Sequence, residues 1–433
     1  SRPTSSASPA RATSFGSDGT RIALVWGTSV LAGVSLAIWL YLVALRGGFW
    51  RADQRLDEAP QAPVPEAWPA VVALVPARDE AAVIGRAIAS LLAQDYPGPL
   101  QVVLADDDSS DATAKNARRA AEIAGRAERL HVVAARPLPA GWSGKPWALH
   151  EALARSAVVA PAAAYLWLSD ADIEHEPATL RRLVAKAEAE RLNLVSLMVG
   201  LSCRGFWERL LIPPFVYFFQ MLYPFPWVND PGRDTAAAAG GCVLLRRDAL
   251  ARAGGFAAIK GELIDDCALA RRIKGLPPAE GAADGARGLW LGLATASRSI
   301  RPYRGLGDIW RMVARSAYTQ LRHSPRRLLA TLMGLALTFL APPLVGLSAG
   351  LHGDNLAAIM GFTAWSLMAL SAVPTYRLYR QPVWLASFLP LAAAFYGAMT
   401  LDSALKHWRG AGGAWKGRIG PAAPEVAQKP RDL

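Results

Sequence analysis

Cysteine is scarce in this chain of 433 residues, which contains three. Cys203, Cys242 and Cys267 lie far apart in the sequence and have neither Cys-x-x-Cys nor Cys/His ligand spacing. A disulfide framework and a structural zinc site both need cysteines in paired or closely spaced patterns. The sequence therefore excludes a small disulfide-stabilised scaffold and a zinc-finger-like module.

Motifs of nucleic-acid binding are also missing, although the formal net charge is +12 at pH 7. No basic strip is interleaved with aromatic residues, and no RNP-like motif is present. The stretch 301–327 instead concentrates seven arginines: Arg301, Arg304, Arg311, Arg315, Arg322, Arg326 and Arg327. Anionic lipids of a cytoplasmic leaflet attract such a juxtamembrane segment. We therefore expect membrane lipids as partners, no nucleic acid, and a cytoplasmic domain before this segment.

Long uncharged runs are plentiful. Residues 22–45 carry no charge and would form a helix of about 36 Å, which exceeds the roughly 30 Å hydrocarbon core of a bilayer. Arg46 follows this run instead of a cleavage site with small residues, so we predict a transmembrane anchor and not a signal peptide. Three later runs, 328–349, 356–373 and 384–401, predict two or three membrane helices within 328–401.

The two ends differ from these runs in composition. Residues 1–20 are rich in Ser, Ala, Thr and Arg without periodicity, and we expect them to form a disordered tail. Residues 402–433 are expected to form a C-terminal tail. Basic residues follow both the second and the third C-terminal run, at Arg377 and Arg380 and again at Lys406. If both positions are cytoplasmic, one of the runs is re-entrant, so the number of spans stays open.

The stretch 68–300 alternates short apolar runs with helical patterns, which is typical of βαβ units and an α/β fold with a mostly parallel sheet. Strands are expected at 71–75, 101–105, 131–135, 165–168, 193–199 and 241–245. Polar turns follow several of them, and ligands of such sheets bind beyond the carboxyl ends of the strands. The aromatic segment 205–228 is expected to lie in the membrane interface, and a buried core segment is the alternative.

Two turns could hold a nucleoside. The run 106–111, Asp-Asp-Asp-Ser-Ser-Asp, can accept hydrogen bonds from a uracil imide or from ribose hydroxyls. Asp and Ser are equally common in ordinary turns and helix N-caps, so both interpretations stay open. The turn 76–80, after the preceding strand, could supply further contacts to the base.

Acidic residues after the fourth strand indicate a cation site. Asp170 and Asp172 offer hard oxygen ligands to a divalent metal ion that would bridge a diphosphate. Glu174 extends this cluster, whereas His175 is expected to be an exposed loop residue. Lys145 lies in a glycine-containing turn that opens a helix, where a cation can approach phosphate, and a solvated lysine is the alternative.

Two adjacent carboxylates, Asp265 and Asp266, open a later helix. They could simply cap the helix dipole. In an active site, one of them could remove a proton from an acceptor hydroxyl, with its pKa raised by acidic neighbours. We favour Asp266 as this general base over Asp265.

Taken in order, these motifs resemble those of inverting family 2 glycosyltransferases. The resemblance implies a GT-A-like catalytic domain with one N-terminal and two to three C-terminal transmembrane helices. It implies nucleotide-sugar binding by Pro76, Arg78, Glu80, Asp107, Lys145 and Asp170. It also implies Mg²⁺ or Mn²⁺ on Asp172 and Glu174, an acceptor side at Gly240, Gly241 and Arg246, and catalysis by Asp266 with Asp265.

More narrowly, the chain resembles hopene-associated glycosyltransferases, with ceramide and carotenoid glycosyltransferases as relatives. This resemblance implies a UDP-sugar donor, a lipid or polyprenoid acceptor, hexosyl or N-acetylhexosaminyl transfer, and a multi-pass protein of the bacterial inner membrane. The family's Gln-x-x-Arg-Trp motif is reduced to Arg315, which favours transfer of a single sugar. A similarity to dolichyl-phosphate mannose synthases keeps a polyprenyl-phosphate acceptor open. A non-catalytic UDP-binding scaffold and a nucleotidyltransferase are the rival hypotheses.

Overall fold

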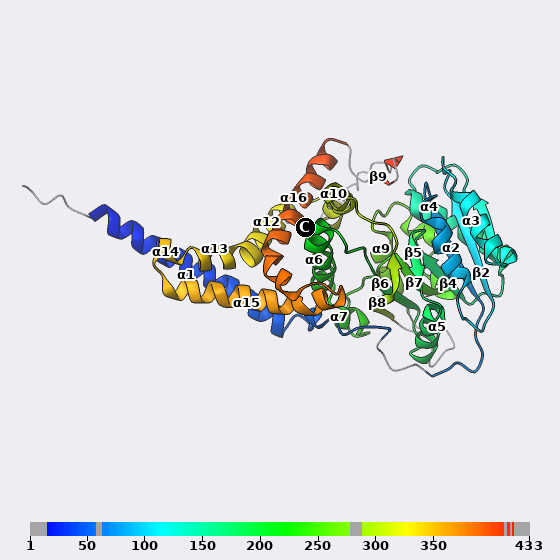
Figure 1. Ribbon diagram of the computed structural model, residues 1–433, viewed down its shortest axis with the longest axis horizontal. Helices are drawn as coiled ribbons and strands as arrows, with labels where there is room; N and C mark the ends of the chain where they lie inside the picture. Colours follow the sequence, from blue (N-terminus) through cyan, green and yellow to red (C-terminus); the bar gives the residue numbers. More distant parts are fainter. Residues whose placement is uncertain (1–14, 58–62, 278–287, 411–413, 416–417, 420–433) are drawn as a thin grey trace, which may run out of the picture.

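The computed structural model describes residues 15–57, 63–277, 288–410, 414–415 and 418–419. An α/β domain and a group of apolar helices follow one another along the long axis of the molecule (Figure 1). The prediction that residues 1–20 form a disordered tail is wrong for residues 15–20, because the first helix begins at Phe15. Residues 1–14, and most of the predicted tail beyond 410, lie outside the described part.

The α/β domain contains an eight-stranded sheet with the order β3-β2-β1-β4-β7-β6-β8-β5. The strands are β1 Val71–Ala77, β2 Leu100–Asp106, β3 Leu130–Ala134, β4 Tyr165–Ser169, β5 Ile173–His175, β6 Leu194–Gly200, β7 Cys242–Arg246 and β8 Leu289–Ser299. Strands β1 to β4 are parallel neighbours, as are β6 and β8, whereas β7 runs antiparallel to β4 and β6. The predicted mostly parallel α/β fold is confirmed, while β5 and β8 were not predicted.

Helices cover both faces of the sheet, as expected for strands that are apolar along their whole length. One face packs on α2 Ile84–Leu92, α3 Thr113–Ile123 and α5 Thr179–Ala189. The other packs on α4 Gly144–Val159, α7 Phe225–Asn229, α8 Arg247–Arg252 and α9 Asp265–Lys274. Strand β1 shows the alternation, since Val71 and Ala73 face the first layer and Val72 and Leu74 the second.

Four helical stretches are long and apolar enough to cross a membrane: Trp26–Ala44, Pro325–Leu347, Asn355–Leu378 and Val383–Trp408. The first stretch belongs to α1 Phe15–Ala44, and the third is α15 Asn355–Leu378. The second consists of α12 Pro325–Leu335, the π-helical turn Ala336–Leu340 and α13 Ala341–Leu347. The fourth consists of the 3₁₀ turn Val383–Phe388 and α16 Leu389–Trp408. One N-terminal and three C-terminal candidate spans are therefore present. The last helix continues seven residues past the predicted limit at 401, to 408.

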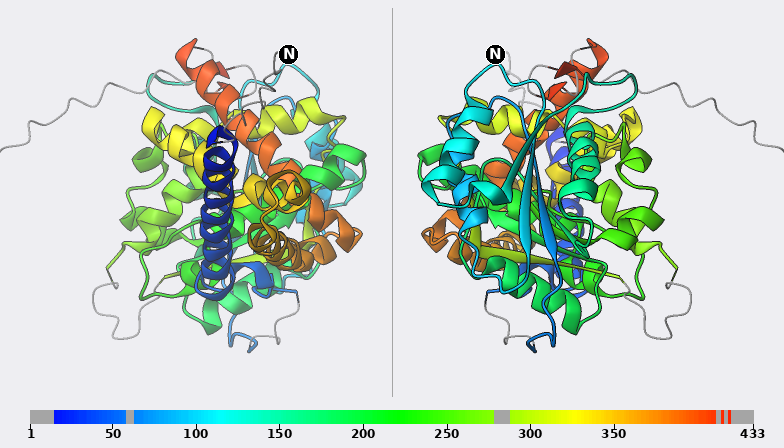
Figure 2. Two further views of the ribbon diagram at one scale, coloured as in Figure 1. Left: turned by 90° about the vertical axis from the view of Figure 1, so that its left-hand side faces the viewer. Right: turned by 90° about the vertical axis from the view of Figure 1, so that its right-hand side faces the viewer.

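Three of the four stretches run side by side, and α16 crosses them (Figures 1 and 2). At the end far from the sheet, Ser29 on α1 donates to Asp354, the N-cap of α15, at 2.5 Å. At the near end, the hydroxyl of Tyr379 accepts a hydrogen bond from the N–H of Leu201 at 3.3 Å. Figure 2 shows α13 and α15 nearly end-on in its left view, with α16 running across them.

Helix α6 Phe206–Leu222 and several shorter elements complete the described structure. The shorter elements are α10 Leu306–Ala314, α11 Ala317–Gln320, α14 Ala349–His352, the 3₁₀ turns Phe49–Arg51, Ala127–Arg129 and Phe256–Ile259, and the pair β9 Ala414–Trp415 and β10 Arg418–Ile419. Helix α6 lies between the sheet and the apolar helices (Figure 1). Its residues Leu211, Ile212 and Tyr217 are fully buried, so the buried-segment alternative describes 205–228 better than an interfacial helix. The side chain of Phe206 remains exposed at its start.

Candidate active site

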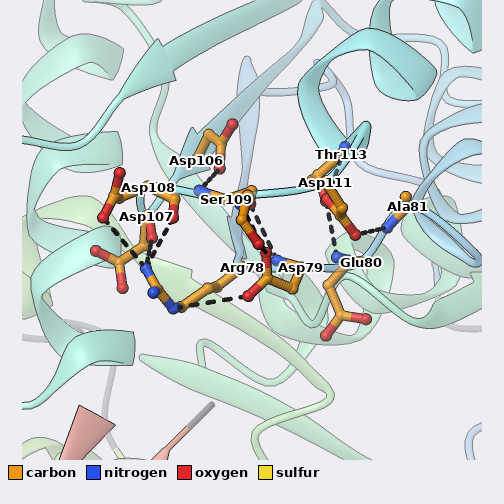
Figure 3. A network of polar contacts seen from close by, with 11 residues as sticks. Arg78, Asp79, Glu80, Ala81, Asp106, Asp107, Asp108, Ser109, Asp111 and Thr113 are labelled. Atoms are coloured by element: carbon orange, nitrogen blue, oxygen red, sulfur yellow. Dashed lines mark hydrogen bonds and ion pairs between the residues drawn. The ribbon is translucent and has the colours of Figure 1, made fainter. Parts of the chain in front are cut away.

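The turns that follow β1 and β2 are tied together by hydrogen bonds (Figure 3). The carboxylate of Asp79 accepts from the N–H of Ser110 at 2.8 Å, and the N–H of Asp79 donates to the Ser109 hydroxyl at 3.0 Å. The N–H of Glu80 donates to the Thr113 hydroxyl at 2.7 Å. Because β1 and β2 are parallel neighbours, both turns emerge at the same edge of the sheet.

Strained backbone marks the same two turns. Asp79 and Asp108 adopt positive φ angles of 51° and 58°, which are uncommon for residues other than glycine. Arg78 stabilises the second turn by donating from its guanidinium to the carbonyl oxygens of Asp107 and Asp108. The side chain of Asp107 is buried beneath this turn. The sequence-predicted nucleotide residues of these turns therefore form one rigid unit.

Arg301 connects this unit with the acidic turn after β4. Its Nε lies 3.1 Å from Oδ2 of Asp172, and its Nη2 forms an ion pair with Glu80. Oδ2 of Asp172 also accepts from the Ser299 hydroxyl at 3.1 Å. Glu80 belongs to the turn after β1. The guanidinium of Arg301 therefore brings the two turns after β1 and β2 close to Asp172, the predicted metal ligand.

Lys145 makes the second connection. Its Nζ lies 2.7 Å from Oδ1 of Asp170 and 3.8 Å from Oδ2 of Asp265, so α4, β4 and α9 meet around one ammonium group. Burial acts to lower the pKa of Lys145, but Asp170, Asp265 and Asp266 together raise it above its usual value. The lysine is therefore charged at neutral pH, and the solvated-lysine alternative is wrong.

Asp266 accepts two backbone hydrogen bonds, from the N–H of Gly240 at 2.8 Å and from its neighbour Cys267 at 2.7 Å. Burial and the adjacent Asp265 raise the pKa of Asp266 to about 6, against the opposing effect of Lys145. A carboxylate with a pKa near neutrality is suited to accept a proton. Gly240 permits this contact, because a Cβ there would lie 3.2 Å from Oδ2 of Asp266 and 2.9 Å from Nζ of Lys145.

A cavity of about 420 Å³ opens from this acidic cluster toward the apolar helices. Its polar end is lined by Lys145, Asp170, Asp172, Gly240, Gly241, Asp265 and Asp266. The opposite wall is apolar and comes from α6 and α10: Phe215, Phe219, Leu222, Met312 and Val313. Arg315 and Gln320 line the cavity as well. A polar reaction centre thus shares one cavity with an apolar surface.

Some predicted site residues lie elsewhere. Both carboxylate oxygens of Glu174 accept from Arg86, and Arg298 also donates to it at 2.9 Å, so the structure does not bring Glu174 to Asp172. Arg246 pairs in register with Tyr165 at the start of β4, which is the opposite edge of the sheet from the site.

The prediction of an exposed His175 is wrong. The side chain is buried and forms hydrogen bonds with Ser169 at 3.0 Å and Ser297 at 2.8 Å. Burial lowers the pKa of His175 to about 3, so the imidazole is neutral and links β5 to β4 and β8. These hydrogen bonds of His175 help to position the acidic turn 170–172, which lies between β4 and β5.

A divalent cation fits the chemistry of Asp170 and Asp172, because carboxylate oxygens from one turn are the ligands that Mg²⁺ and Mn²⁺ prefer. Within the described residues, no group of three or more His, Cys, Asp or Glu side chains is placed so that it could hold a metal ion by itself. The protein would therefore contribute these two carboxylates, and the remaining positions would be left to phosphate oxygens and water.

Arg301 is a site residue that the sequence reasoning missed, since it was assigned only to the basic juxtamembrane segment. The signal was present in the run 289–296, Leu-Trp-Leu-Gly-Leu-Ala-Thr-Ala, which forms most of β8. Strand β8 is parallel to β6, so its carboxyl end points toward the edge where the other acidic turns gather. An arginine two residues beyond that strand, after Ser299, was therefore a candidate.

The comparisons with known proteins agree with this geometry. Residues 72–254 match the family model described as glycosyl transferase family 2. No curated protein matches the chain. The mannosyltransferase PcManGT from Pyrobaculum calidifontis, solved in complex with GDP-Man and Mn²⁺, is similar in structure, with 21% identity and a TM-score of 0.51 over 88% of this chain and 99% of that chain.

Two further solved structures have lower scores. Glucosyl-3-phosphoglycerate synthase from Mycobacterium tuberculosis, in complex with UDP, has 20% identity and a TM-score of 0.38 over 62% of this chain and 87% of that chain. Mannosyl-3-phosphoglycerate synthase from Rubrobacter xylanophilus has 19% identity and a TM-score of 0.36 over 66% of this chain and 84% of that chain. The fold is GT-A-like, and residues 72–254 are similar to the glycosyl transferase family 2 model.

Proposed function

We propose that this protein is a membrane-bound glycosyltransferase that moves one sugar from a nucleotide sugar, a UDP-sugar, to a lipid acceptor with inversion of configuration. The observation that carries the proposal is the shared cavity, in which Lys145, Asp170 and Asp266 lie opposite an apolar wall. The reacting groups suit a sugar diphosphate, and the wall suits the tail of a lipid. Hopanoid or other glycolipid biosynthesis is the corresponding role.

The proposed chemistry is a single displacement at the anomeric carbon. Asp266, with its pKa of about 6, removes the proton from an acceptor hydroxyl as that oxygen attacks. The nucleoside diphosphate leaves from the opposite face, where Lys145 can balance its growing negative charge. One transfer of this kind inverts the anomeric centre and needs no covalent intermediate.

The donor would be held by the turns after β1, β2 and β4. Asp107 and the unit around Asp79 would contact the base and ribose, and Asp170 and Asp172 would hold Mg²⁺ or Mn²⁺. When bound, such a cation neutralises charge on the departing diphosphate. PcManGT, whose solved structure contains GDP-Man and Mn²⁺, has a similar fold and makes GDP-sugars the natural alternative to test.

The orientation of α16 supports a cytoplasmic catalytic domain. Trp310 on α10 donates to Asp402 at 2.7 Å, and the N–H of Tyr318 on α11 donates to Ser403 at 3.1 Å. These contacts hold the C-terminal half of α16 beside the catalytic domain. In the proposed arrangement α16 would not span the bilayer, and the basic residues near 377–380 and 406–409 would lie on the same side as the catalytic domain, in accord with the positive-inside rule.

A polyprenyl phosphate is a second candidate acceptor, because Arg315 lines the cavity and has no carboxylate within 4 Å among the described residues. A guanidinium at this place could pair with the phosphate of such a lipid. In that case the phosphate oxygen would itself be the nucleophile. The two candidates differ in their need for a base, so substitution of Asp266 separates them.

The direct test is transfer of labelled sugar in detergent or nanodiscs. Purified protein with Mn²⁺ is given UDP-[¹⁴C]glucose, UDP-GlcNAc or GDP-mannose, together with lipids extracted from bacterial membranes. A labelled lipid identified by mass spectrometry, accompanied by release of nucleoside diphosphate, supports the proposal. Nucleotide binding without transfer to any lipid would favour the non-catalytic scaffold, and release of pyrophosphate a nucleotidyltransferase.

A further inference from the structure

The strand end that carries Arg301 is tied to Asp172 by three contacts. The N–H of Ile300 donates to the Asp172 carbonyl at 2.9 Å, the Ser299 hydroxyl to Oδ2 at 3.1 Å, and Nε of Arg301 to the same Oδ2 at 3.1 Å. The other side of the Arg301 guanidinium pairs with Glu80. The guanidinium of Arg301 therefore occupies Oδ2 of Asp172, an oxygen that a metal ion bound to Asp172 would need as a ligand.

The acidic cluster as a whole still attracts a cation. Two basic side chains, Lys145 and Arg301, face five carboxylates: Glu80, Asp170, Asp172, Asp265 and Asp266. A nucleoside diphosphate brings negative charge of its own and would offer the guanidinium an alternative partner. Arginine binds such oxygens through a planar fork of N–H donors. Exchange of Arg301 from Asp172 to the diphosphate would free Oδ2 for the metal ion.

Arg301 is also joined to the acceptor side of the cavity. Residues 302–305 alone separate it from α10, whose Met312 and Val313 line the apolar wall. The N–H of Tyr303 donates to Glu208 at the start of α6 at 3.0 Å, which fixes the intervening loop. A shift of Arg301 would therefore be transmitted along a short, anchored connection to α10.

We propose that Arg301 is a positioning residue that keeps Asp172 from binding a metal ion until the nucleotide sugar arrives, and that its release couples donor loading to the α10 wall of the acceptor cavity. The inference rests on the proposed function, because it assumes that Asp172 is a metal ligand. It predicts ordered binding, in which nucleotide and cation strengthen each other and the cation alone binds weakly.

The first measurement is the affinity for Mn²⁺ alone, by electron paramagnetic resonance of the purified full-length protein. Arg301→Gln should bind Mn²⁺ at least about tenfold more tightly than wild type, because a competing positive charge is removed. Arg301→Lys keeps the charge and should stay close to wild type. Arg298→Gln is the matched control, since Arg298 lies near the end of β8, three residues before Arg301, and pairs with Glu174 outside the cluster.

The second measurement is hydrogen exchange in peptides that cover α10. Addition of UDP with Mn²⁺ should change the exchange of residues 306–314 in wild type and in Arg298→Gln, and should leave it unchanged in Arg301→Gln. Circular dichroism and thermal melting check that each variant is folded.

Failure of the inference and failure of the function look different. Equal Mn²⁺ affinity in wild type and Arg301→Gln, or a change in α10 exchange in that variant as large as in wild type, overturns the role of Arg301 while nucleotide binding persists. Absence of UDP and GDP binding in every form of the protein overturns the proposed function itself.

Discussion

At the scale of single residues, the site is organised by pairs of opposite charge. Lys145 and Arg301 each join acidic residues from different elements, so removing either cation would leave carboxylates near one another without their shared positive charge. Asp266 differs from the others, because its oxygens accept backbone N–H groups and its pKa is raised to about 6. This separation of roles underlies two predictions.

Asp266→Asn should lower the rate of transfer to a hydroxyl-bearing lipid by at least about 10²-fold, because the general base is lost. Binding of UDP with Mn²⁺, measured by calorimetry, should remain close to wild type, since the proposed donor contacts lie elsewhere. Asp248→Asn, at a surface ion pair with Arg246, serves as the control and should leave the rate unchanged. Near-normal turnover of Asp266→Asn would remove the base assignment and favour a phosphate nucleophile.

The pH dependence of transfer follows from the raised pKa of Asp266. The base must be unprotonated, so kcat/KM should fall as the pH decreases through about 6 and should level off above it. Lys145 stays charged across this range, because the surrounding carboxylates raise its pKa. A pH–rate profile from 5 to 8 measures the effect, and a flat profile through pH 6 would contradict it.

At the scale of elements, one face of α6 packs in the protein interior and the other lines the cavity. On its buried side Val216 packs against the sheet layer, whereas Leu211 and Tyr217 pack against other helices. Phe219 and Leu222 line the cavity. The prolines Pro213 and Pro214 lie inside this helix, where they cannot donate the usual backbone hydrogen bonds to the carbonyl oxygens four residues earlier. The element therefore forms a wall along which an apolar tail can lie.

Leu222→Gln should raise KM for a long-chain lipid acceptor several-fold while leaving donor binding unchanged, because a polar group is placed against the proposed tail. The Leu222 side chain is 52% exposed, so the substitution should not unfold the protein. A short-chain acceptor should show no difference. Ile123→Gln, at a 77% exposed position on α3, is the control, and equal effects of both substitutions would argue against the acceptor path.

At the scale of the whole molecule, α16 runs in a different direction from the other apolar helices. Three helices run between the end that contains Asp354 and the end that contains Tyr379 and the catalytic domain. Helix α16 then packs beside α10 and α11 instead of returning along the bundle. The C-terminal half of α16, with Asp402 and Ser403, therefore lies beside α10 and α11.

Cysteine labelling in intact cells tests this arrangement. In a Cys203→Ser background, Gly353→Cys should react with an impermeant maleimide and Arg409→Cys should react only after permeabilisation. The native Cys242 and Cys267 are buried and contribute little background. Reaction of Arg409→Cys in intact cells would show that α16 crosses the membrane as a fourth span.

The sequence by itself determined the α/β class, the apolar helices that are candidate spans and the acidic turns at the strand ends, because strand alternation, run length and polar turns are local patterns. Tertiary structure alone decided three matters. It placed Arg301 on Asp172, turned Glu174 and Arg246 away from the cluster, and laid α16 across the other helices. Each of these depends on strand order or on helix packing between residues far apart in the chain, which no local pattern encodes.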